Sequence, residues 1–188
     1  MFKRKIKEKN RTCNTKEDFL EIREELKRFG IANFIWDMEN LKIFSNGIIN
    51  KKNNPFAKLI EKYDNDIRKK RDFTNNEDYI MVSSIYDEKH KLLIPKSFDW
   101  ETFNVLTLSK KHIPMLQKMK EIAIEYVTKQ KYKEYFLCFH CYPFNSVHTL
   151  HLHIVNCELE PYFLSKNNNL SLDIVLECLE ELESLEEL

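Results

Sequence analysis

The sequence predicts an α+β fold with a mostly antiparallel sheet, and two observations lead to this prediction. First, short strand-like segments occur as two close pairs, which is typical of adjacent antiparallel strands. Second, an amphipathic helical pattern separates the pairs. The chain has only 2 glycines, too few for a glycine-rich phosphate loop, which excludes P-loop and Rossmann folds. The predicted strands cover 79–84, 90–95, 135–141 and 147–155, and the helix covers 111–128.

The 188 residues suit one domain with an appendage, and we divide them into a helical N-terminal extension, 1–75, and a domain, 76–188. Within the extension, 15–29 is predicted to be a helix that Thr15 caps, with Phe19 and Ile22 on its apolar face. A second helix is predicted to start at Asn54-Pro55, because proline is favoured in the first helical turn.

The elements of the domain follow from its hydrophobic periodicity. The segments 79–84 and 90–95 form a predicted hairpin, and 97–108 is a connection in which a short strand is one interpretation. The apolar residues of 111–128 recur at helical spacing, which indicates core packing rather than a cofactor site. A final helix over 170–185 is predicted to turn its leucines inward and its glutamates outward.

The composition excludes several classes of function. The formal net charge is +0, so no overall electrostatic attraction to nucleic acid is expected. No apolar run is long enough to span a bilayer, which argues against a membrane partner. The 5 cysteines are an odd number and no secretory segment precedes them, which favours a reducing compartment, the cytoplasm or the nucleus.

Two histidines stand two positions apart in an apolar run, His151 and His153. In a strand these side chains share one face, while Leu150, Leu152 and Ile154 turn to the other face and into a core. Such a pair is either a pair of satisfied polar residues, a metal site or a catalytic site. Zinc would need about four ligands, for which His140 and Cys141 are candidates beside the pair, but no second pair stands at a familiar ligand spacing.

The segment from Phe139 to Val155 resembles the signature of the histidine-triad superfamily. The closer resemblance is to the branch of histidine triad nucleotide-binding protein 3, with aprataxin further off. In that branch a Phe-His, a proline turn and a serine precede the triad, and here they are Phe139-His140, Pro143-Phe144 and Ser146. The triad positions fall on Thr149, His151 and His153, and the upstream segment from His90 to Pro95 resembles another strand of the family.

This resemblance implies a hydrolase or transferase acting at the α-phosphate of nucleoside phosphoramidates, dinucleotides or nucleotidylated adducts. His151 would be the nucleophile and His153 would donate a proton to a phosphate oxygen. Neither a cofactor nor a metal is implied, and the partner is a purine nucleotide or nucleotide conjugate, with a homodimer compatible with the family. Further nucleotide-binding residues implied by position are Ser146, Asn145, His140, His148 and His90.

Several departures from the family favour an alternative, a nucleotide-binding or interaction protein with weak or no turnover. Thr149 stands where relatives have the first triad histidine, and a β-bulge would be needed to bring His148 into its place. Val82, Ser83 or Ser84 occupies the acidic position that holds the ribose in relatives. For His90 we favour the interpretation of a partly exposed strand residue.

Overall fold

The computed structural model describes residues 13–29, 44–45, 48–49, 55–64, 75–84, 90–97, 102, 104–141, 147, 149–158 and 169–186. It confirms the predicted α+β fold. The elements in chain order are α1 (Lys16–Phe29), β1 (Phe44–Ser45), β2 (Ile48–Ile49), α3 (Pro55–Asp64), β3 (Tyr79–Ser83), β4 (Lys91–Pro95), η2 (Val105–Thr107), η3 (Lys110–His112), α4 (Ile113–Lys129), β5 (Tyr135–His140), β6 (Leu152–Asn156), β7 (Asn169–Ser171) and α6 (Leu172–Glu186).

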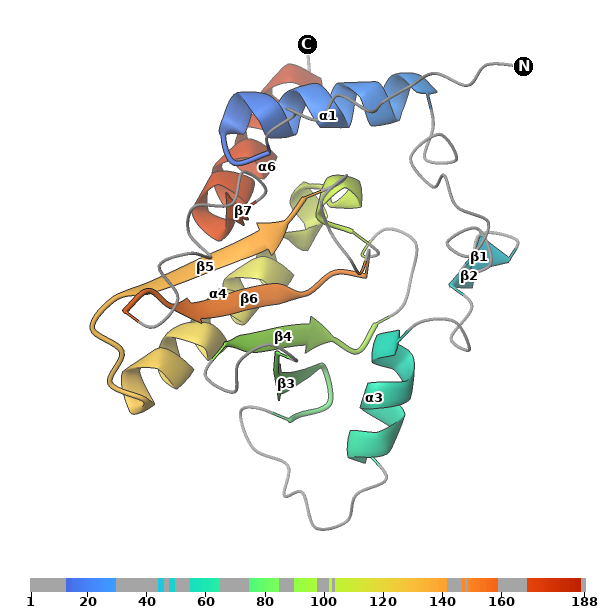
Figure 1. Cartoon of the computed structure of the whole chain (residues 1–188). Coiled ribbons are helices and arrows are strands. Elements are labelled where there is room, and N and C mark those ends of the chain that lie inside the picture. The colour runs from blue at the N-terminus through green and yellow to red at the C-terminus, as the bar shows by residue number, and fades with distance from the viewer. Residues whose placement is uncertain are drawn as a thin grey trace.

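The main sheet of the described residues has the strand order β3-β4-β6-β5-β7, and each neighbouring pair is antiparallel (Figure 1). The predicted hairpin and the predicted pairing of the two later strands are confirmed. However, β6 starts at Leu152 rather than at residue 147. The pairing of β4 with β6 ends at Leu93 and Leu152, and two residues later Pro95 has no amide hydrogen with which to extend it.

Two smaller differences concern short elements. β7 was not predicted, because three residues are too few to show an alternating pattern; it pairs with the outer edge of β5 through Leu170 and Phe139. The connection after β4 contains the 3-10 turn η2 instead of a strand in its described part, since the side chain of Asn104 accepts a hydrogen bond from the amide of Leu106.

One face of the sheet carries the main hydrophobic core, which α4 and α6 cover. Alternate strand residues point into it, and on β6 these are Leu152 and Ile154, as predicted. The periodic positions of α4 and α6 face them, including Leu116, Met119 and Val175. Since neighbouring strand residues alternate, the residues between those of the core point to the opposite face.

Helix α1 adds to this same core although it lies in the predicted N-terminal extension. The capping prediction is confirmed, because the Thr15 hydroxyl accepts from the amide of Asp18 and the Asp18 carboxylate accepts from the amide of Thr15. Phe19 and Ile22 are buried among the residues of α4 and α6. The division of the chain at residue 75 stays a prediction, but α1 is part of the core.

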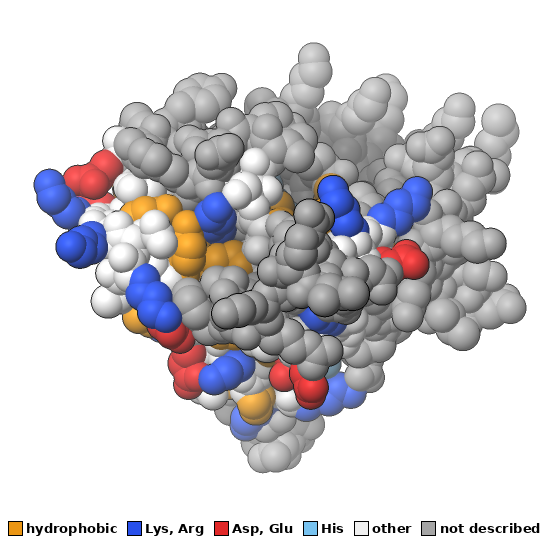
Figure 2. Space-filling view, turned by 90° about the horizontal axis from the view of Figure 1, so that it is seen from below, with side chains coloured by type: hydrophobic (Ala, Val, Ile, Leu, Met, Phe, Trp, Pro, Cys, Tyr) orange, Lys and Arg blue, Asp and Glu red, His pale blue; other side chains and the backbone are white. Residues whose placement is uncertain are grey.

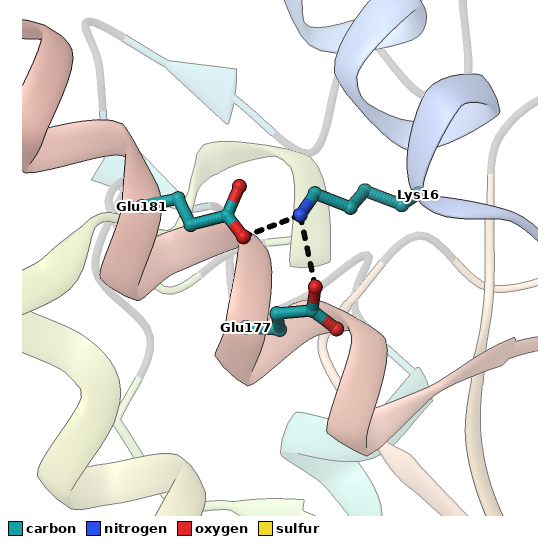
Figure 3. A network of polar contacts seen from close by, with 3 residues as sticks. All are labelled: Lys16, Glu177 and Glu181. Carbon is teal, nitrogen blue, oxygen red and sulfur yellow. Dashed lines mark hydrogen bonds and ion pairs between the residues drawn. The ribbon is translucent and has the colours of Figure 1, made fainter.

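An ion-pair network fixes the start of α1 against α6. The Lys16 ammonium contacts the carboxylates of both Glu177, at 2.9 Å, and Glu181 (Figure 3). The two glutamates lie one helical turn apart on α6, so one ammonium reaches both. The hydrogen bond to Glu181 and then that to Glu177 raise the pKa of Lys16, which keeps it charged.

Because Ile22 is 1% exposed in the core, we expect Ile22→Val to lower the free energy of unfolding by about 0.5–1.5 kcal/mol. The matched control is Ile124→Val on α4, where the same methylene is removed from a residue that is 38% exposed. The control should change stability by less than about 0.5 kcal/mol. Urea denaturation followed by circular dichroism measures both, and equal effects would show that α1 does not pack on the core.

The opposite face of the sheet is partly covered by α3. Phe56 and Ile60 of this helix pack with Ile80, Val82 and Ile94 of the hairpin. On the molecular face seen from below, positive and negative side chains of the described residues are interspersed (Figure 2). Among the described residues, no helix is long and apolar enough to cross a membrane.

Candidate active site

Four histidines from separate parts of the chain gather on the sheet face opposite α4 and α6. His153 is at the centre of this histidine cluster, which we define as His90, His140, His151 and His153. Its ring centroid lies 3.9 Å from that of His140, 4.7 Å from that of His151 and 5.0 Å from that of His90. The predicted association of His140, His151 and His153 is therefore found, and His90 joins it.

Strand alternation and register explain why these side chains meet. His153 lies between two residues that turn to the core, Leu152 and Ile154, so it points to the opposite face. Its register partners are Cys138 on β5 and Leu92 on β4. His140 follows Cys138 by two positions and His90 precedes Leu92 by two, so both point to the same face as His153.

His151 has the geometry of an imidazole nucleophile. Its Nδ1 lies 2.6 Å from the carbonyl oxygen of Thr149. A carbonyl only accepts hydrogen bonds, so Nδ1 carries the proton and Nε2 keeps the free electron pair. Burial lowers the pKa of His151 from 6.5 to about 4, although the hydrogen bond to Thr149 opposes this shift. The ring is therefore neutral near pH 7, the only state in which it can attack an electrophile.

The interpretation of His90 as a partly exposed strand residue is wrong. His90 is 4% exposed, and its Nε2 lies 2.8 Å from Nδ1 of His153. One of these nitrogens donates and the other accepts, so the two rings share a single proton along this contact. When His90 donates, His153 carries its own proton at Nε2, which then becomes a donor for an oxygen of a bound ligand. The contact therefore couples the tautomer of His153 to that of His90.

Thr149 contributes through its backbone. Thr149 is buried, but both Thr149 and His151 precede β6, so the prediction that one strand from residue 147 contains both is wrong. The carbonyl that orients His151 is present whatever the side chain at this position, because every residue has one. Of the other predicted nucleotide-binding residues, Asn145, Ser146 and His148 lie outside the described residues.

The four ligands considered for zinc do not come together. Cys141 is buried in the main core on the helix side of the sheet, whereas the histidine cluster is on the other side. Within the part of the chain that the structure describes, no group of three or more His, Cys, Asp and Glu side chains is placed to hold a metal ion.

Phe56 is a contact of the cluster that the sequence interpretation did not include. Its ring lies 5.0 Å from that of His151, with an angle of 69° between the ring planes. In the sequence Phe56 stands in an ordinary helical apolar pattern, from which no contact with a residue almost 100 positions away can be inferred. The ring contact depends on how α3 docks on the sheet.

A neutral imidazole with a fixed tautomer beside a second imidazole that can donate a proton is suited to nucleophilic chemistry on phosphorus. The first ring attacks, while the second stabilises the negative charge that develops on the oxygens. Both rings are more than nine-tenths buried, so their interactions with a bound anion are less screened by water than those of surface groups.

A family model described as "Scavenger mRNA decapping enzyme C-term binding" matches residues 47–168. This range is more than half of the 188 residues and includes α3 and the whole histidine cluster. A search of curated proteins found no match.

Proposed function

Because the chain belongs to the scavenger mRNA decapping enzyme C-terminal family, which is part of the histidine-triad superfamily, we propose that it hydrolyses nucleotide conjugates at the α-phosphate. The reaction proceeds through a covalent nucleotidyl intermediate on His151. The observation that carries this proposal is the hydrogen bond from Nδ1 of His151 to the Thr149 carbonyl, which leaves Nε2 as the nucleophilic nitrogen.

In the first step a bond forms between Nε2 of His151 and the α-phosphorus, and the bond from phosphorus to the leaving group breaks. The leaving oxygen or nitrogen takes a proton from a nearby donor, for which His153 is the best placed of the described residues. In the second step water attacks the same phosphorus, the phosphorus–nitrogen bond breaks, and the electron pair returns to Nε2 of His151. The water's proton passes to the group that protonated the leaving group.

The other residues of the site have supporting roles. In this proposal the proton shared between His90 Nε2 and His153 Nδ1 belongs to His90, so that His153 keeps its own proton on Nε2, where the phosphate oxygens need it. His140, whose ring is stacked near that of His153, adds a polar group on the β5 side. Ser146, Asn145 and His148 are proposed phosphate contacts on the strength of the sequence resemblance alone.

The class of substrate follows from the family and from the reaction. Nucleoside phosphoramidates, dinucleotides and nucleotidylated adducts all place a leaving group on an α-phosphorus, and the mRNA decapping named in the family description adds cap compounds to the proposed class. The nearer relationship to histidine triad nucleotide-binding protein 3 and aprataxin, and a location in the cytoplasm or nucleus, belong to the proposal.

A second candidate is a nucleotide-binding protein with little turnover. It is favoured by Thr149 at the first triad position and by Val82, Ser83 or Ser84 at the position where relatives have an acidic residue near the ribose. Binding without turnover would leave no covalent intermediate, so the two candidates differ in a measurable product.

The test is a search for a nucleotidyl adduct on His151 by mass spectrometry. The protein is incubated with adenosine phosphoramidate, and in parallel with a methylated cap dinucleotide, then denatured rapidly and digested. We expect the peptide that contains His151 to gain the mass of a nucleoside monophosphate residue with at least one of the two compounds. Tight binding of both compounds with neither adduct nor hydrolysis would favour the second candidate.

A further inference from the structure

Helix α3 comes from outside the segment that resembles the histidine triad, yet the ring of its Phe56 contacts His151, the proposed nucleophile. From the ring contact described above we infer that Phe56 is a positioning residue, which holds the His151 ring against the Thr149 carbonyl and keeps water from it. This inference rests on the proposed function, in which His151 is the nucleophile.

His151 needs such a contact because the sheet does not hold it. The register of β6 with β4 and with β5 includes His153 but not His151, which directly precedes the strand. Its orientation therefore depends on side-chain contacts. The hydrogen bond to Thr149 determines which nitrogen carries the proton, and the Phe56 ring restricts rotation about the remaining torsion.

Phe56 is itself held in place by apolar neighbours. It packs with Ile60 on the next turn of α3 and with Ile80, Val82 and Ile94 of the hairpin. Phe56 is 7% exposed, so its ring has little freedom to move away from His151. Because the Phe56 ring is held by this cluster, it contacts His151 from a fixed position.

The same contact favours the neutral form of His151. An aromatic ring replaces water that would solvate an imidazolium, and burial is the leading cause of the lowered pKa of His151. This loss of water disfavours a positive charge on His151.

Few other described groups can account for the protonation state. Burial raises the pKa of Cys138, so its thiol stays neutral, and Lys58, Glu61 and Lys62 of α3 are exposed. Among the described side chains, the titratable and charged groups on the elements around His151 are His153 on β6, Tyr135, Cys138 and His140 on β5, His90 and Lys91 at β4, and Lys58, Glu61 and Lys62 on α3.

The test compares Phe56→Ala with the control Ile60→Ala. The control removes a buried apolar side chain from the same helix and cluster, but Ile60 has no ring that contacts His151. The pKa of His151 is measured by NMR titration of protein labelled at histidine, without substrate, with the signal assigned through His151→Ala. We expect Phe56→Ala to raise this pKa by about one unit or more, and Ile60→Ala to leave it in place. The pH at which kcat/KM falls on the acid side should rise in Phe56→Ala and stay unchanged in Ile60→Ala.

Equal pKa shifts in the two variants, or none in either, would overturn the inference even if the protein is an active hydrolase. A selective shift in Phe56→Ala supports it even if no substrate is turned over, in which case only the proposed function fails. If circular dichroism shows that Phe56→Ala does not fold, Phe56→Leu and Ile60→Val replace the pair. Phe56→Leu should then raise the pKa of His151, and Ile60→Val should leave the pKa of His151 unchanged.

Discussion

Replacing His151 with alanine is expected to abolish hydrolysis of nucleoside phosphoramidates and to remove the covalent adduct. The reason is that the variant has no nitrogen at the position from which phosphorus is attacked. The neighbouring rings of His140 and His153 cannot take this position, because they come from other points of the backbone. Loss of a catalytic nucleophile lowers kcat by about 10⁴-fold or more in enzymes that use one. Steady-state hydrolysis of adenosine phosphoramidate measures the effect.

The matched control is His112→Ala, since His112 is also buried but lies at the start of α4 on the helix side of the sheet. Its Nδ1 accepts a hydrogen bond from the amide of Ser109, so the control loses a stabilising cap of about 1 kcal/mol and keeps the histidine cluster. We expect it to hydrolyse substrate at close to the wild-type rate. Equal turnover by wild type and His151→Ala would exclude covalent catalysis at this position.

The pH dependence of stability offers a check on the same residue. In the folded protein the pKa of His151 is lowered to about 4 from 6.5, so the unfolded chain binds more protons between these values. The contribution of His151 to the free energy of unfolding is therefore complete above about pH 6.5 and falls as the pH is lowered toward 4. In His151→Ala this part of the pH dependence should disappear.

The second large effect is expected for His153→Ala, which should lower kcat by about 10²–10⁴-fold, the usual contribution of a general acid or base. Unlike His151→Ala, this variant should still form the nucleotidyl adduct, because the nucleophile remains. Rapid quenching followed by mass spectrometry would detect the adduct, and its complete absence would show that His153 is needed for attack itself.

The contact between His90 and His153 makes a further prediction for this pair. If His90 acts only by holding the tautomer of His153, then His90→Ala should lower kcat in the wild type but have little further effect in His153→Ala. The double-mutant cycle measures this coupling directly. Additive losses in the double variant would mean that His90 acts on the substrate independently of His153.

The fold class follows from local patterns that tertiary contacts did not change. The alternation of apolar residues around His153 and the helical spacing of Leu116 and Met119 each reflect a face that must be buried. The capping of α1 by Thr15 likewise depends on only four consecutive residues. For this reason the main strands, the principal helices and the shared face of His151 and His153 were predicted from the sequence.

The completion of the site depends on distant residues, which no local pattern reveals. Strand register places His90 beside His153, and the docking of α3 places Phe56 against His151. The early end of the β4–β6 pairing, near Pro95, leaves Thr149 outside the strand, so it contributes its carbonyl oxygen. The sequence by itself therefore determined that two histidines share one face, on which the proposed chemistry rests. Only the tertiary structure decided that Nδ1 of His151 carries the proton and that the ring is neutral, because tautomer and pKa depend on the partners and the burial that packing creates.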